Sequence, residues 1–214
     1  HERDLLEAQL EELKHKVPVK YDKVSTSYEA DELERRLANA IAPDGISAFV
    51  FNFVDLLTHG RSESAILYEV ARDEIALRQL TLQWFKRSAL FSVLQEAARR
   101  RVKVLVTSDH GSIHCHTPAT VFAKRDATQN LRYKFGEDLR AEDPDLALLF
   151  KSEDALKLPR RGLGANTLIA TGDSFFVYPT KLREYQSRYR GSFLHGGVTP
   201  EECILPVSLL TPKR

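Results

Sequence analysis

The stretch ISAFVFNFV, residues 46–54, is almost continuously apolar and rich in β-branched and aromatic residues. A run of this kind after the turn Pro43-Asp44-Gly45 is typical of a strand buried on both faces, as in a parallel sheet. The run VKVLVT, residues 102–107, predicts a second such strand. Because helices are expected to alternate with these strands, the sequence predicts an α/β fold, a three-layer sandwich with a mainly parallel sheet. Apolar residues at helical spacing predict helices over residues 2–16, 28–42 and 181–189, and two helices over 62–101 with a break near 84–88.

The second half of the chain has weaker patterns. Short apolar runs at residues 168–170 and 175–178 flank a Gly-Asp turn, which predicts a hairpin. Residues 203–210 predict a last strand, in which Pro206 favours an edge position. The polar stretch at about 112–160 is expected to be an irregular insertion, and connections of that length are usually functional.

Composition excludes several classes of protein. The chain has 214 residues, of which 43% are hydrophobic, enough for one sizeable core. Its formal net charge is +1, whereas general nucleic-acid or membrane-surface binders usually carry a larger excess of one sign. No apolar run is long enough to span a bilayer, so no membrane partner is expected. With no secretory signal and two cysteines that favour reduced thiols, the sequence predicts a cytoplasmic protein.

Carboxylates and imidazoles follow the two predicted buried strands. The first strand runs into Asp55 and His59, whose spacing places both side chains on one face of a helix. The second strand runs into Asp109-His110-Gly111, where the glycine gives the backbone freedom to turn. In open α/β sheets, sites form beyond the carboxyl ends of strands, so these two pairs are expected at one edge of the sheet. Such ligands are normal for zinc.

A third element adds one more imidazole. His195 precedes two glycines in FLHGGVTPEE, and Thr199-Pro200 predicts the start of a helix. Taken singly, each of these groups has an ordinary structural explanation: Asp109 as a cap at a strand end, His59 as a helix surface residue and His195 as a loop residue. In combination they favour a metal site.

These motifs resemble those of a known family. Asp-x-x-x-His, then Asp-His-Gly after a buried strand, then a distant His is similar to the alkaline phosphatase superfamily. The resemblance is closest to its PglZ-domain branch, and within that branch to PorX-type response regulators, in which a receiver domain precedes the PglZ domain. It covers most of the chain and rests on the runs NFVDLLTHGRSE, TSDHGSI, NLRYKFG, ATGDSFFVYP and FLHGGVTPEECILPV.

The resemblance implies two zinc ions. Asp55, His59 and His195 are expected to hold one, and Asp109 and His110 the other, together with an upstream Asp and an upstream Thr or Ser nucleophile. The chain offers no candidate for either upstream residue. It also lacks methionine and opens with His1. We therefore expect residues 1–214 to be the C-terminal part of one PglZ domain, without the N-terminal part, the nucleophile and a receiver domain.

Three cations are candidates for contact with a phosphate group. Arg61 follows His59 closely, and its planar fork suits phosphate oxygens, although a solvated helix residue is an equal alternative. Arg132 and Lys134 are further candidates, with Tyr133 between them as a stacking surface. The nearby His114 and His116 are interpreted as a polar strand face rather than as ligands of a third metal.

The sequence therefore predicts an enzyme, a zinc-dependent phosphodiesterase or phosphatase that is the output domain of a two-component response regulator. The expected partners are a phosphate-ester substrate, for which a nucleotide is one candidate, the signalling partners of such a system, and a second copy in a homodimer. The alternative is a regulatory module that keeps its metals but acts through protein or DNA contacts without catalysis. A phosphoglycerate-mutase-like relative with manganese fits the surrounding motifs less well.

Overall fold

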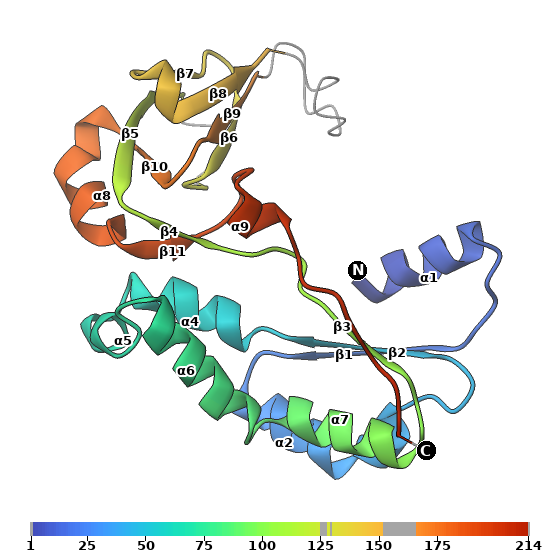
Figure 1. Ribbon diagram of the computed structural model, residues 1–214. Helices are drawn as coiled ribbons and strands as arrows, with labels where there is room; N and C mark the ends of the chain where they lie inside the picture. Colours follow the sequence, from blue (N-terminus) through green and yellow to red (C-terminus); the bar gives the residue numbers. More distant parts are fainter. Residues whose placement is uncertain (1, 125–127, 129, 152–165, 214) are drawn as a thin grey trace. The chain divides into compact units, whose positions relative to one another are not determined.

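The computed structural model describes residues 2–124, 128, 130–151 and 166–213. The chain divides into two compact units, each with its own internal packing (Figure 1). The first unit comprises His1–Leu57, Ile75–Val106 and Ser208–Arg214, and the second comprises Thr58–Glu74 and Thr107–Val207.

The described helices and strands follow one another in chain order. The helices are α1 Glu2–Glu12, α2 Ser27–Arg35, α3 Leu37–Ala40, α4 Phe53–Arg61, α5 Ala65–Val70, α6 Glu74–Phe85, α7 Ala89–Arg99, α8 Leu182–Tyr189 and α9 Pro200–Cys203, with 3₁₀ turns at Pro144–Leu146 and Pro179–Lys181. The strands are β1 Val19–Val24, β2 Ile46–Phe51, β3 Val104–Val106, β4 Ile113–Cys115, β5 Thr117–Phe122, β6 Tyr133–Gly136, β7 Arg140–Ala141, β8 Ala147–Phe150, β9 Asn166–Ala170, β10 Ser174–Val177, β11 Ser192–Leu194 and β12 Ser208–Leu210.

The first unit is built on a parallel pair, β1 with β2, in which Val19 lies opposite Ile46 and Val24 opposite Phe51. Helices α2 and α7 lie side by side in Figure 1 and pack on each other. Each begins with a side chain that accepts a backbone N–H, Thr26 for α2 and Ser88 for α7. The core of this unit is apolar and consists of Val24, Leu33, Ala40, Ala89 and Val93.

The second unit contains three small sheets, ordered β10-β5-β7, β6-β9-β8 and β11-β4. Strand β10 is buried on both faces, and its alternating side chains feed two cores. Phe176 packs into a cluster with Val121 and Leu168, whereas Phe175 and Val177 pack into one with Leu194. This second cluster places apolar packing directly before His195.

Several expectations about the sheets are wrong. Five of the seven strand pairs in the described residues are antiparallel, so a sandwich with a mainly parallel sheet is not confirmed. The fold is α/β with small mixed sheets. An apolar run shows that a strand packs against something, but it does not give the direction of the neighbouring strand. The runs at 46–54 and 102–107 do form strands, but β2 is half-buried and β3 is largely exposed.

The expected hairpin and the expected insertion also differ from the structure. Strand β9 pairs with β6 and β8, whereas β10 pairs in parallel with β5, so the turn between them links two different sheets. Apart from 125–127, 129 and 152–160, which lie outside the described residues, the stretch at 112–160 forms five strands, β4 to β8, rather than an irregular chain. The strand expected over 203–210 begins only at Ser208, because Cys203 ends α9.

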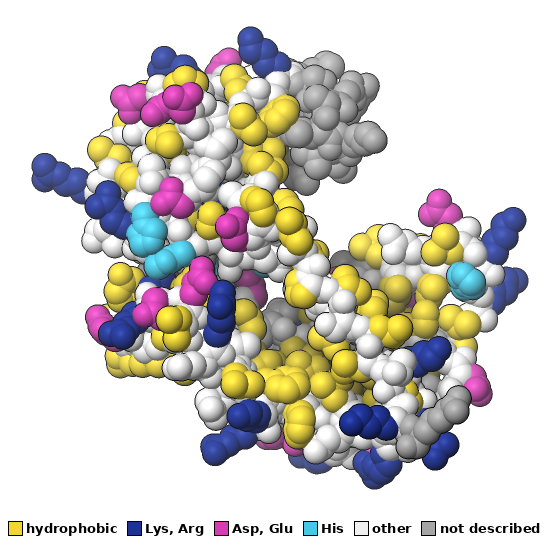
Figure 2. All heavy atoms as spheres, viewed as in Figure 1, with side chains coloured by type: hydrophobic (Ala, Val, Ile, Leu, Met, Phe, Trp, Pro, Cys, Tyr) yellow, Lys and Arg dark blue, Asp and Glu magenta, His cyan; other side chains and the backbone are white. Residues whose placement is uncertain are grey.

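Three smaller findings bear on the class of protein. Both cysteines are free, Cys115 buried and Cys203 exposed. Among the described residues, none of the helices has the length and apolar character needed to cross a membrane. On the face drawn in Figure 2, Lys and Arg side chains are scattered among Asp and Glu rather than gathered in one patch.

Candidate metal centre

Helix α4 carries the first two candidate ligands. The chain leaves β2 at Phe51 and enters α4 at Phe53, so Asp55 lies in the first turn of the helix. His59 follows one turn later, and the helix therefore presents both side chains on one face, as the spacing predicts.

His110 lies in the loop between β3 and β4. Its Nδ1 is 3.1 Å from the carbonyl oxygen of Gly111. Because a carbonyl only accepts, this contact needs a hydrogen on Nδ1, and in the neutral ring that leaves on Nε2 the lone pair that a metal ion requires. The backbone N–H of Gly111 donates to the carbonyl oxygen of Glu202 at 2.9 Å. A Cβ at Gly111 would collide with the backbone of Glu201, so this close approach requires glycine.

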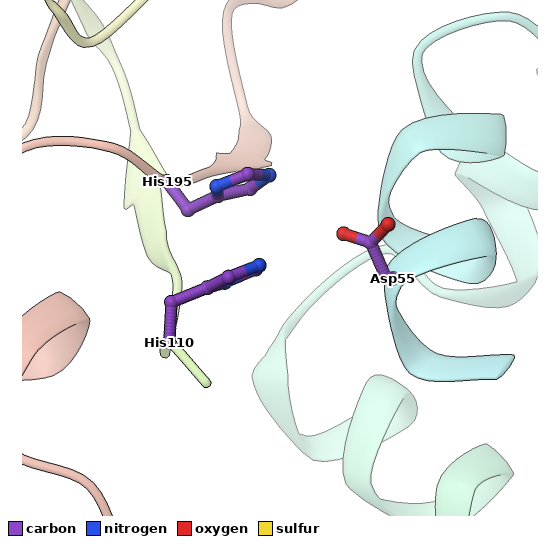
Figure 3. A group of neighbouring side chains, drawn as sticks. All are labelled: Asp55, His110 and His195. Carbon is purple, nitrogen blue, oxygen red and sulfur yellow. The ribbon is translucent and has the colours of Figure 1, made fainter. Parts of the chain in front are cut away.

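His195 follows β11 and meets two other histidines of the second unit. Its ring stacks on that of His110, with centroids 3.9 Å apart and planes 13° from parallel (Figure 3). Its Nε2 lies 3.1 Å from Nε2 of His59. Two imidazole nitrogens bound to one tetrahedral zinc at about 2.0–2.1 Å are separated by roughly 3.3 Å. The His59–His195 distance is therefore close to the one that a shared zinc ion imposes.

Glu202 holds the loop that carries His195. Its carboxylate accepts from the backbone N–H of Gly197 at 2.8 Å and from that of Thr199 at 3.2 Å. Thr199 lies directly before α9, and Pro200 begins that helix, as the sequence predicts. Since the carbonyl of the same Glu202 accepts from Gly111, one residue ties the His110 loop to the His195 loop.

Arg132 completes this arrangement. It donates to both carboxylate oxygens of Glu202, at 3.0 Å and 2.6 Å, and to the carbonyl of Ser174. A Cβ at Gly197 would lie 2.5 Å from Nη2 of Arg132 and 2.6 Å from Oε2 of Glu202, so the ion pair fills the space beside this glycine. Burial alone raises the pKa of the Glu202 carboxyl, but hydrogen bonds from Arg132 and Gly197 outweigh it and the net pKa is lowered.

The three cations considered for phosphate contact are all buried. Arg132 and Lys134 are 0% exposed and Arg61 is 1% exposed. Arg61 donates to the carbonyls of Gly191 and Arg72 and lies over the Tyr68 ring. A phosphate contact from any of the three would require its side chain to leave these partners.

Lys134 is enclosed in the same way. Its Nζ donates to the carbonyls of Thr128 and Asn130 and lies 4.7 Å from the centroid of the Tyr178 ring. Burial lowers the pKa of this ammonium group to about 8. The contacts made by Arg61, Arg132 and Lys134 join loops and strands of the second unit, so these cations act as internal supports.

Two other predicted groups lie differently. The Asp109 side chain is 93% exposed and accepts from the backbone N–H of His110. Its carboxylate is therefore open to solvent, while the neighbouring imidazole stacks on His195.

His114 and His116 contact each other through ring nitrogens 3.2 Å apart, and His114 donates to the carbonyl of Gly191. Both lie at strand β4, where backbone and ring contacts account for them without a metal.

A hollow of about 200 Å³ adjoins His59 and His195 in the second unit. Its wall includes Arg188 from α8 and Asn130, neither of which was predicted from the sequence. Asn130 lies in the segment before β6, and Arg188 lies near the end of α8, seven positions before His195. No pattern in the sequence pointed to Arg188, which is one of several charges on an amphipathic helix.

The comparisons with known proteins agree with the motifs. The chain matches the family described as "BREX system PglZ alkaline phosphatase-like domain" over residues 1–209. The chain belongs to the PglZ family. None of the curated proteins compared with this PglZ domain matches it. Membership in an alkaline-phosphatase-like family makes the hydrolysis of phosphate esters the type of reaction to consider, and proteins of that superfamily generally use metal ions.

The residues of this PglZ domain fit such a metal. Within the second unit, Figure 3 shows the stacked rings of His110 and His195, and imidazole is one of the groups that zinc prefers. His59 and His195 have ring nitrogens at a spacing suited to one ion. The groups of the second unit that would hold a metal are thus His59, His110 and His195.

Proposed function

We propose that this PglZ domain supplies the metal-binding half of a zinc-dependent phosphodiesterase or phosphatase. The observation that carries the proposal is the convergence of His59, His110 and His195, which come from three separate motifs, within one compact unit. A shared zinc ion would account for two ring nitrogens at this spacing.

The assignment of ligands follows the motif order. Asp55, His59 and His195 are proposed to hold one zinc ion, and Asp109 and His110 a second. Asp55 is included because helix α4 carries it one turn before His59. Zinc supplies positive charge that stabilises the oxygen atoms entering and leaving phosphorus. The protein's own contribution is to keep the imidazoles aligned, which Glu202 and the carbonyl of Gly111 support.

The proposed cellular setting is the output domain of a two-component response regulator in the cytoplasm. It rests on the resemblance of the motifs to PorX-type proteins. The rival proposal is a regulatory module that binds zinc but acts through protein or DNA contacts. Hydrolysis of a generic phosphodiester by the natural full-length protein, with and without a chelator, separates the two: chelator-sensitive turnover supports the enzyme, and its absence in a zinc-loaded protein supports the module.

The zinc site itself is tested by metal content after dialysis. We expect the His195→Ala variant to lose at least one equivalent of zinc relative to the unmodified chain, because His195 contacts both other histidines. The matched control is His15→Ala, an exposed histidine of the first unit, which should keep its zinc. Full zinc retention by His195→Ala, or no zinc in the unmodified chain, would overturn the proposal.

A further inference from the structure

The hollow beside the histidines is built entirely from residues of the second unit. Helix α4, helix α8, the segment before β6 and the end of β11 each contribute to its wall. Its lining residues include His59, Glu63, Asn130, Arg188 and His195. The wall therefore combines two proposed zinc ligands with one arginine, one glutamate and one amide.

The size of the hollow limits its ligand. A volume of about 200 Å³ equals roughly six or seven water molecules at about 30 Å³ each. Sites for complete small molecules usually measure about 300–1,000 Å³. The hollow thus suits a phosphate group and a few further atoms better than a whole nucleotide.

Arg188 provides the positive charge in this wall, and its side chain is far more exposed than those of the buried cations. Its Nη2 lies 3.1 Å from Oε1 of Glu63, and the two side chains are 44% and 68% exposed. Ion pairs with this exposure are weak, because water and salt screen them. An anion that enters the hollow therefore competes with Glu63 for the guanidinium. Arg61, Arg132 and Lys134 have no comparable freedom, since each is enclosed by protein partners.

Asn130 offers a second donor. Its Oδ1 accepts from the backbone N–H groups of Arg132, at 2.8 Å, and Tyr133, at 3.2 Å. These two bonds fix the orientation of the amide, so its NH₂ group is the part that can donate to a ligand in the hollow. A planar guanidinium and an amide NH₂ are a suitable pair for the non-bridging oxygens of a phosphate.

We propose that Arg188 is the phosphate-contacting residue of this site, with Asn130 as a second donor and Glu63 as the carboxylate that the phosphate displaces. The substrate class is an ester whose phosphate group fills the hollow and whose remainder lies outside it. This inference rests on the proposed function, since it places the phosphate beside the zinc ligands His59 and His195.

The proposal predicts opposite effects for the two members of the ion pair. Loss of Arg188 removes the cation that binds phosphate, so binding weakens. Loss of the charge at Glu63 removes both a competitor for Arg188 and a source of repulsion for an anion, so binding strengthens. A general disturbance of the local structure would weaken binding in both variants.

The test is calorimetric titration of the zinc-loaded 214-residue chain with inorganic phosphate. We expect about tenfold weaker binding for Arg188→Ala, as for the loss of one charge-assisted contact, and roughly threefold tighter binding for Glu63→Gln. Arg188→Lys should be intermediate, because it keeps the charge but loses the planar fork. Arg183→Ala is the matched control, since Arg183 lies on α8 but does not line the hollow.

The outcomes distinguish this inference from the function on which it rests. If the unmodified chain binds no zinc, the proposed function fails. If zinc binds but phosphate affinity is the same in Arg188→Ala and Arg183→Ala, the role of Arg188 is overturned. Should Arg188→Ala fold poorly, Glu63→Gln still decides, because weaker or unchanged phosphate binding in that variant contradicts displacement of Glu63.

Discussion

The two units of the chain bury different kinds of side chain. In the first unit the core is a cluster of aliphatic residues around Leu33, and its buried carboxylate, Glu96, pairs with the neighbouring Arg99 and Arg100 on α7. The second unit adds buried charges whose partners lie far along the sequence, such as Arg132 with Glu202. Apolar packing has no direction, whereas hydrogen-bonded charge fixes distances and angles. Long-range polar contacts thus accompany the loops that carry the histidines.

The largest effect is expected for Arg132→Leu, which tests whether the Arg132–Glu202 ion pair positions the loops that carry the histidines. Removing one partner of a buried ion pair leaves an uncompensated charge and destabilises a protein by about 3–5 kcal/mol. We expect a loss of this size in the free energy of unfolding, measured with urea, and weaker zinc binding under conditions where the variant is still folded. Unchanged zinc affinity in the folded variant would show that the ion pair supports stability alone.

A somewhat smaller effect is expected for Leu33→Ala in the first unit. Leu33 is 0% exposed, and such truncations destabilise by about 2–5 kcal/mol, depending on how far the cavity collapses. Zinc affinity of the folded variant should stay at its original value, because the histidine ligands belong to the second unit. Leu5→Ala, at a side chain that is 68% exposed, is the control for stability. A large fall in the zinc affinity of Leu33→Ala would show that the core of the first unit also supports zinc binding.

The smallest effect concerns pH and Lys134. Its pKa of about 8 in the folded protein is below the ordinary 10.5. The unfolded chain therefore binds more protons between these two pH values, and the free energy of unfolding rises with pH across that window. Relative to Lys134→Met, which does not titrate, we expect the stability of the unmodified chain to gain up to about 3 kcal/mol. Below pH 8 the difference should be constant.

The control for this pH dependence is Lys124→Met. Lys124 pairs with Glu137 and Asp138 at the surface of the same unit. Its pKa is raised rather than lowered, so it should contribute no gain in stability over the Lys134 window. A flat difference between the unmodified chain and Lys134→Met would mean that Lys134 titrates normally.

Local features of the sequence predicted local structure well. The positions of α4 and α9 followed from spacing and from a Thr-Pro start signal, and α4 carries Asp55 and His59 as expected. Sheet pairing could not be predicted in the same way, because an apolar run does not specify its neighbour. The hairpin expected between β9 and β10 illustrates this, since each strand pairs elsewhere.

The histidines of the candidate site could be predicted from the sequence, because histidine is itself a common metal ligand. His59, His110 and His195 stood in motifs, and the structure brings them together. The roles of the arginine and lysine side chains were harder to predict, because the sequence does not show whether such a side chain contacts a ligand or a backbone carbonyl. Arg132 lies in a recognisable motif yet binds Glu202, whereas Arg188 lies in an ordinary helix and lines the hollow.

The two hydrogen bonds from Gly111 and Gly197 end on the same residue, Glu202. Neither loop can lift away without disturbing the group that restrains the other. We therefore expect the segments that present His110 and His195 to open together, with similar free energies of exchange for their amide hydrogens.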